Sequence, residues 1–189
     1  MADMTWTVVV TPIGGLGLRV EDNAVSGVSF GADAGGVVTS RHAKRPTPRD
    51  ELRGSGPATG SDPAAGLLVD AVRELEEYFA GERTGFTVPA RPGRGTPFER
   101  AVWAEIAAIP YGETMSYGAI ARAVGEPGGA QAVGLACNRN PLPIIVPCHR
   151  VIGSDGKLVG FGGGLDRKRW LLRLEARIAI ERSFAGEAI

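Results

Sequence analysis

The chain has 189 residues, enough for one domain or two small ones with a real core. Its 21 basic and 21 acidic residues cancel to a formal charge of zero, which excludes a general electrostatic attraction to nucleic acid or anionic membrane. Two cysteines and two histidines occur without metal-ligand spacing, and there is neither a long apolar stretch nor a signal core. We therefore expect a cytoplasmic protein with reduced thiols, no metal, no cofactor and no membrane contact.

The first thirty residues alternate β-prone runs with turn signals, which predicts a small antiparallel sheet. The following stretch, residues 31–60, is rich in Gly, Pro and Ala, and residues 41–53 hold five basic residues against two acidic ones. Two interpretations of the loop at about residues 35–60 stay open: a solvated flexible loop, or a loop that contacts DNA.

A helix is predicted next, because Ser61 or Asp62 can cap it, Pro63 suits its first turn and Gly81 can end it. Its apolar positions recur at helical spacing, namely Leu67, Leu68, Ala71, Leu75 and Phe79. The sheet and this helix form a predicted first unit over residues 1–90, and residues 87–97 are predicted to be a linker.

The second unit, residues 96–178, begins with a strong helix start, because Thr96 and Glu99 make a capping box and Pro97 follows the cap. The apolar face of that helix comprises Phe98, Val102, Ile106 and Ile109. Helices at about 116–124 and 130–138, joined by the turn GEPGG, have the outline of a helix-turn-helix.

A last helix is predicted near Asp166, its cap, with an apolar face formed by Trp170, Leu171, Leu174 and Ile178. Residues 91–175 hold eleven basic and seven acidic residues. This local surplus places any nucleic-acid surface on the second unit.

Cys148 lies between two apolar runs, and a buried cysteine of this kind is commonly a small packing residue. Pro147 instead suggests that a buried strand, PIIV, ends just before the thiol, where chemistry can be mounted. His149 could assist in removing the thiol proton. Adjacent strand side chains point to opposite faces, so that assistance requires a bent backbone or a bridging water. A cysteine protease is disfavoured, because the other histidine, His42, lies in the loop-like segment.

Three stretches together resemble the O6-alkylguanine-DNA alkyltransferases, also called methylated-DNA–protein-cysteine methyltransferases. They are GTPFERAVWAEIAAIPYGETMSYGAIARAVG, QAVGLACNRNPLPIIVPCHRVIG and GFGGGLDRKRWLLRLE, and together they span about Thr96 to Glu175. The resemblance implies an α+β fold with an N-terminal ribonuclease-H-like antiparallel sheet and helix. It also implies a mostly helical, winged-helix-like C-terminal domain that carries the helix-turn-helix.

The same resemblance implies irreversible, single-turnover repair of O6-alkylguanine and O4-alkylthymine in double-stranded DNA. The protein would approach through the minor groove and rotate the damaged base out of the stack, since an intact stack hides the O6 atom. We expect a monomer, and cooperative assembly on DNA stays open.

By resemblance, Cys148 accepts the alkyl group, and His149, oriented by Glu175, takes the thiol proton through a water. Tyr117 donates to the leaving purine, Asn140 holds the active-site turn, and Lys168 lies near the thiol. Taken singly, each partner has a plainer interpretation as a half-buried aromatic, a turn residue or a solvated helix charge.

The implied DNA-binding residues are Ser116, Ala130, Gln131, Ala132, Gly134, Asn138 and Arg139. Gln131 stands where the family commonly has an arginine, and Asn138 occupies a second, commonly basic position, so we expect weaker DNA affinity than is usual in the family. The implied substrate pocket comprises Cys137, Val151, Leu158, Val159, Phe161 and Gly162.

Cys137 has two interpretations, a packing residue or a redox or secondary acceptor thiol. Two alternative functions also stay open: a lesion-binding protein without transfer activity, and a regulator that senses alkylation. The first kind lacks the acceptor cysteine that this chain retains.

Overall fold

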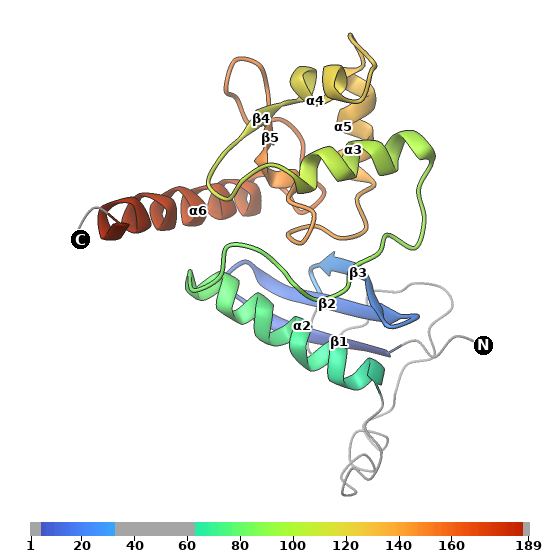
Figure 1. Cartoon of the computed structure of the whole chain (residues 1–189), viewed down its shortest axis with the longest axis vertical. Helices are drawn as coiled ribbons and strands as arrows, with labels where there is room; N and C mark the ends of the chain where they lie inside the picture. Colours follow the sequence, from blue (N-terminus) through green and yellow to red (C-terminus); the bar gives the residue numbers. More distant parts are fainter. Residues whose placement is uncertain (1–4, 33–62, 187–189) are drawn as a thin grey trace, which may run out of the picture.

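The structure is a computed structural model that describes residues 5–32 and 63–186. Its N-terminal part contains a three-stranded sheet (Figure 1). Strands β1 (Thr5–Thr11), β2 (Gly14–Glu21) and β3 (Ala24–Phe30) are antiparallel, in the order β1-β2-β3. Alternate side chains of β2 are buried, which is the period expected of a strand with one covered face: Leu16, Leu18 and Val20. The predicted sheet is confirmed, whereas the basic loop at about residues 35–60 lies outside the described residues.

Helix α2 (Pro63–Ala80) packs against all three strands and ends where predicted. Gly81 has φ = +82°, a left-handed conformation that favours glycine after a helix. The predicted apolar positions all face the core of the first unit: Leu68, Ala71 and Leu75 are buried in it, and Leu67 and Phe79 are half-buried against it. Glu74 and Tyr78 are buried as well, and both have hydrogen-bond partners inside the protein. The predicted caps, Ser61 and Asp62, lie outside the described residues.

The second unit contains the predicted helices. Helix α3 (Pro97–Ala107) begins with the complete Thr96–Glu99 capping box. Helices α4 (Tyr117–Ala123) and α5 (Ala130–Asn138) form the predicted helix-turn-helix, and Ser116 caps α4. Two short parallel strands, β4 (Met115–Ser116) and β5 (Val151–Ile152), join the start of α4 to the segment after Cys148.

The segment before Cys148 is a compact turn, so the predicted PIIV strand is wrong. Three prolines in PLPIIVP, residues 141–147, cannot donate ladder hydrogen bonds, and Ile144 has φ = +78°, which a strand does not allow. Strand β3 binds this turn, since Val28 N donates to Pro141 O at 2.8 Å. Leu142 and Ile144 are buried in the core that the sheet forms with α2.

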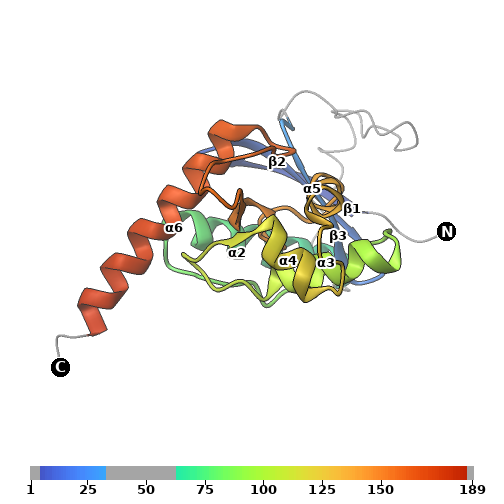
Figure 2. The ribbon, with the colours of Figure 1, turned by 90° about the horizontal axis from the view of Figure 1, so that it is seen from above.

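Helix α6 (Leu165–Gly186) starts at Leu165, so Asp166 is in its first turn and is not its cap. The buried face of α6 comprises Leu171, Leu174 and Ile178, which join the core of the first unit, and Trp170 is half-buried against it. The C-terminal half of α6 projects away from the rest of the molecule (Figures 1 and 2). The protein thus has two cores. The segment that leads to Cys148 connects them, because Leu142 and Ile144 belong to the first core and Cys148 belongs to the second.

Candidate active site and DNA-binding face

Cys148 is the first residue of a 3-10 turn, η1 (Cys148–Arg150), and its side chain is only 4% exposed. Burial raises the pKa of this thiol, and a hydrogen bond with Asn140 and the charge of Lys168 oppose that rise. The thiol is therefore protonated at neutral pH. It needs a base before it can act as a nucleophile.

Asn140 braces the turn that leads to Cys148. Its Nδ2 donates to Val146 O at 2.8 Å, and its Oδ1 accepts from Leu142 N at 2.9 Å. Both bonds join Asn140 to backbone groups within six residues along the chain. The asparagine side chain thus takes the place of hydrogen bonds that a neighbouring strand would otherwise supply. Asn140 thus bonds the backbone on both sides of the turn.

His149 is fully buried, and its Nε2 lies 2.8 Å from Glu175 Oε1. Because a carboxylate only accepts, Nε2 carries the hydrogen and Nδ1 has the free lone pair. Burial lowers the pKa of His149, although the hydrogen bond to Glu175 raises it in part, so the ring is neutral. Nδ1 has no hydrogen-bond partner among the described residues. A buried acceptor in that state is suited to a water or to an incoming proton.

Glu175 lies at the centre of a buried network. Its Oε1 accepts from Tyr78 Oη at 2.6 Å, and its Oε2 accepts from Gly112 N at 3.2 Å. Arg150 donates to both oxygens, with Nη2 2.9 Å from Oε1 and Nε 2.8 Å from Oε2. Burial alone would raise the pKa of Glu175, but the bonds from His149 and Arg150 outweigh it and hold the pKa at about 2. The carboxylate therefore stays charged and orients His149.

Two side chains of this network, those of Arg150 and Tyr78, were not predicted as site residues. Arg150 is only 6% exposed, and its Nη1 also donates to Ile109 O at 2.6 Å. The sequence carried a signal for it, because an arginine directly after a buried run must find a partner. Tyr78 had no such signal, since it is one position before the predicted apolar residue Phe79 in α2.

Tyr117, Lys168 and Val159 form a second hydrogen-bonded group. The hydroxyl of Tyr117 donates to Val159 O at 2.8 Å and accepts from Lys168 Nζ at 3.3 Å. Lys168 is fully buried, and its Nζ also donates to the carbonyls of Val151, Val159 and Gly160. Burial lowers the pKa of Lys168 and raises that of Tyr117 to about 12. Tyr117 therefore keeps its hydrogen and can donate it.

Helix α5 carries most of the predicted DNA-binding residues. Arg139, the C-cap of α5, is paired with a carboxylate of α3, because its Nη1 donates to Glu99 Oε1 at 3.0 Å. Ser116 accepts a hydrogen bond from Ala119 N at 3.1 Å as the cap of α4. Ala130 and Gly134 are half-buried, whereas four residues are exposed: Gln131, Ala132, Asn138 and Arg139. This face thus presents one charge, and an acidic partner already neutralises it in part.

The predicted pocket residues form two groups. Cys137 and Val151 are buried in the same core as Cys148, and burial raises the pKa of the Cys137 thiol to about 12. The others belong to the loop before α6, where Leu158 and Phe161 are half-buried and Val159 and Gly162 are exposed. The ring of Phe161 packs edge-on against Phe30 of β3, with 5.3 Å between centroids. The first unit therefore supports one wall of the predicted pocket.

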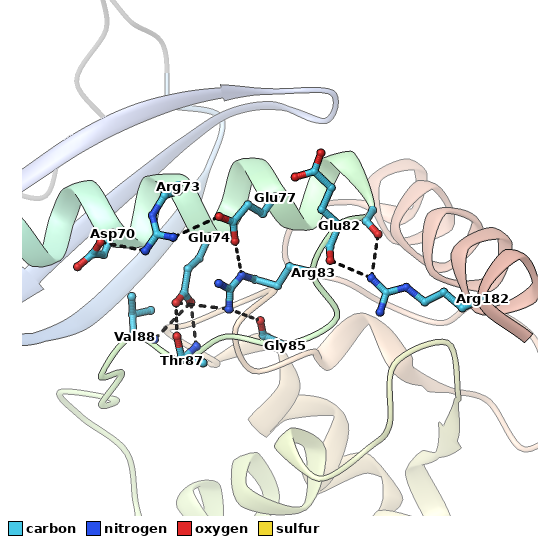
Figure 3. Close-up of polar contacts among 11 residues, drawn as sticks. Asp70, Arg73, Glu74, Glu77, Glu82, Arg83, Gly85, Thr87, Val88 and Arg182 are labelled. Atoms are coloured by element: carbon cyan, nitrogen blue, oxygen red, sulfur yellow. Dashed lines mark hydrogen bonds and ion pairs between the residues drawn. The ribbon is translucent and has the colours of Figure 1, made fainter. Parts of the chain in front are cut away.

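A hollow of about 460 Å³ lies elsewhere, beside the C-terminal end of α2, and none of the predicted site residues lines it. Figure 3 shows the contacts of its two arginines: Arg83 forms ion pairs with Glu74 and Glu77, and Arg182 of α6 donates to the backbone carbonyls of Gly81 and Glu82. Within residues 5–32 and 63–186, no group of three or more His, Cys, Asp or Glu side chains could hold a metal ion. No helix in that part of the chain is long and apolar enough to span a bilayer.

Comparisons with known proteins agree over both units. Residues 97–177 match the family described as 6-O-methylguanine DNA methyltransferase, DNA binding domain, and residues 4–92 match its ribonuclease-like domain. A methylated-DNA–protein-cysteine methyltransferase of Mycobacterium leprae is 57% identical over 113 residues, covering 60% of this chain and 68% of that protein. One from Methanosarcina acetivorans is 57% identical over 106 residues, covering 56% and 67%. The solved structure of Mycobacterium tuberculosis OGT in complex with DNA has a TM-score of 0.74 and 43% identity, covering 92% of this chain and 93% of that one.

Proposed function

This chain belongs to the 6-O-methylguanine DNA methyltransferase family and repairs DNA by alkyl transfer to a cysteine of the protein, and on that premise we propose that Cys148 is the acceptor. The substrate is O6-alkylguanine, and also O4-alkylthymine, in duplex DNA. The lesion is approached from the minor groove and rotated out of the stack into the site, because a thiol cannot reach the O6 atom inside it. An alternative function, lesion binding without transfer, is not favoured by the names of the relatives.

The observation that carries this proposal is the orphaned Nδ1 of His149 opposite an Nε2 held by Glu175. A water bound at Nδ1 passes the thiol proton of Cys148 to the imidazole, and the Glu175 carboxylate stabilises the imidazolium that results. The thiolate then attacks the alkyl carbon in line: the S–C bond forms, the C–O6 bond breaks, and its electron pair goes to the purine.

Tyr117 disperses the charge on the leaving purine. Its hydroxyl exchanges Val159 O for a ring nitrogen of the base, while Lys168 continues to donate to the hydroxyl oxygen and strengthens the Tyr117 donor. The thioether on Cys148 resists hydrolysis, so each molecule acts once. Asn140 keeps the turn in place throughout.

The DNA-binding role belongs to the second unit, residues 96–178, with α5 in the minor groove and Gln131 near the base left behind. Supporting it are the exposed, small side chains along α5 and the approach of α5 to the site, where a Cβ built on Gly134 would lie 3.9 Å from the Tyr117 ring. The first unit, residues 1–90, supports the site. We infer a monomer that works in the cytoplasm.

The test is to incubate the full chain with a duplex containing O6-methylguanine and to weigh the protein. We expect a gain of one methyl group that Cys148→Ala abolishes. Cys137→Ala is the matched control, since it removes the other thiol of the same core and should retain the gain. A gain that survives Cys148→Ala, or no gain in the unaltered chain, would refute the proposal. Lesion binding without any gain in mass would favour the non-transferring alternative.

A further inference from the structure

Tyr78 connects the first unit to the carboxylate of the active site. It lies on α2, is fully buried, and donates its hydroxyl hydrogen to Glu175 Oε1 at 2.6 Å. The same oxygen is 2.8 Å from His149 Nε2. Only two hydrogen bonds therefore separate a residue of the N-terminal unit from the imidazole of His149.

The position of Tyr78 is fixed independently of that hydrogen bond. Its ring packs against Phe79, Phe86 and Tyr111, with centroids 5.4, 5.5 and 6.0 Å apart. At the end of α2, Arg182 of α6 donates to the carbonyls of Gly81 and Glu82 (Figure 3). The loss of the hydroxyl alone therefore leaves α2 docked on α6.

We propose that Tyr78 is a positioning residue for alkyl transfer, through which the N-terminal unit orients Glu175 and, by way of Glu175, His149. The inference rests on the proposed role of His149 as the base. Of the three donors to Oε1, the other two, His149 and Arg150, come from the Cys148 turn itself. Tyr78 comes from the first unit, so its hydrogen bond to Oε1 depends on how α2 is placed against α6.

The hydroxyl of Tyr78 also affects the pKa of His149, through the charge on Glu175 Oε1. A donor that occupies Oε1 withdraws charge from it, so the carboxylate stabilises the imidazolium less. Removing the donor should therefore raise the pKa of His149. The other charged or titratable groups around the His149–Glu175 pair are unchanged by that substitution: Arg150 of η1 and Lys168 of α6, which act on His149, the neighbouring Cys148, and Tyr111 of the loop after α3, which acts on Glu175.

Tyr78→Phe is the test, and Tyr111→Phe is its matched control. Both remove one buried phenolic hydroxyl from the same cluster of rings, but the hydroxyl of Tyr111 has no hydrogen-bond partner among the described residues. The chain has two histidines, so His42→Gln in all samples leaves one imidazole signal, that of His149, in a titration followed by NMR. The second measurement is the single-turnover rate of protein methylation by a duplex with O6-methylguanine.

We expect Tyr78→Phe to raise the midpoint of the His149 titration by about half a unit to one unit. We expect the methylation rate at neutral pH to fall about tenfold, the worth of one hydrogen bond to a charged group, with DNA affinity unchanged. Tyr111→Phe should match the unaltered protein in both. A midpoint or a rate equal to that of the unaltered protein overturns the proposal, as does a control that behaves like Tyr78→Phe.

These measurements separate this inference from the function on which it rests. If the unaltered protein takes up no methyl group, the proposed function fails and Tyr78 has no transfer to position. If the unaltered protein takes up the methyl group normally and Tyr78→Phe leaves the His149 titration midpoint unchanged, the proposed function stands and this inference fails.

Discussion

Acid should destabilise this protein through Glu175, and Glu175→Gln should remove that part of the effect. The pKa of Glu175 is about 2 in the folded protein, against 4.5 for an unperturbed carboxyl. The folded pKa is depressed, so the unfolded chain takes up the proton first. The stabilisation is therefore complete above about pH 4.5 and is lost as the pH falls towards 2.

The magnitude follows from the gap between the ordinary pKa of 4.5 and the folded pKa of about 2, which is roughly 2.5. At about 1.4 kcal/mol per unit, this amounts to about 3 kcal/mol of the free energy of unfolding. Glu175 has 0% exposure, so solvent screens the interaction little. A loss of that size is a large share of the roughly 5 to 15 kcal/mol that holds a typical domain folded.

The assay is urea unfolding of the full chain at a series of pH values. The unaltered protein and Glu126→Gln, which removes an exposed carboxylate, should lose about 3 kcal/mol more between pH 4.5 and 2 than Glu175→Gln does. His149 contributes a separate loss below its ordinary pKa of 6.5, because burial lowers its folded pKa. At neutral pH, Glu175→Gln should already be less stable by about 3 to 5 kcal/mol, because Arg150 is left buried without its partner.

Equal losses between pH 4.5 and 2 in the unaltered protein and in Glu175→Gln would refute this reasoning. A direct check that needs no substitution is the carboxyl carbon signal of Glu175 followed by NMR. A titration midpoint near 4.5 would show that the network does not hold the charge.

Three further predictions concern other parts of the molecule. Methylation of Cys148, which is 4% exposed, should overpack its site by about 1 to 3 kcal/mol and lower Tm by several degrees in calorimetry; an unchanged Tm would contradict this. Gln131→Arg should tighten DNA binding and steepen the salt dependence of log Kd by about one unit in anisotropy titrations, whereas an unchanged slope would show that Gln131 does not face DNA. Gly81→Ala should reduce the free energy of urea unfolding by at least about 1 kcal/mol, because φ is +82° and a Cβ would lie 2.5 Å from Ile178 Cδ1; wild-type stability would contradict it.

Elements defined by neighbouring residues were predictable from the sequence. The Thr96–Glu99 capping box and the glycine after α2 both lie where predicted, because each depends on contacts within one turn of chain. The start of α6 was misplaced by two residues, since a cap at Asp166 puts the first helical residue at 167 and the helix begins at Leu165; Asp166 is an equally acceptable residue inside a first turn.

The PIIV segment shows where such reasoning fails. Its apolar, β-branched composition is typical of a buried strand, but its neighbours in space are the edge of β3 and the core of the first unit. Those long-range contacts, together with the Asn140 side chain, make the tight turn more favourable than a strand. Burial was thus predicted correctly for Pro143 and Ile144, whereas Ile145 and Val146 are half-buried, and the conformation was predicted wrongly.

The sequence by itself determined the family resemblance and the chemical groups of the site, because Cys148 and His149 are contiguous and the accompanying motifs are local. Which groups meet was decided by the tertiary structure. Tyr78 and Glu175 are 97 positions apart, and Arg150 and Glu175 are 25 apart. Their hydrogen bonds exist only because α2 and the Cys148 turn both pack against α6. A buried carboxylate keeps its charge only where enough donors converge on it, and that convergence depends on packing that no local pattern encodes.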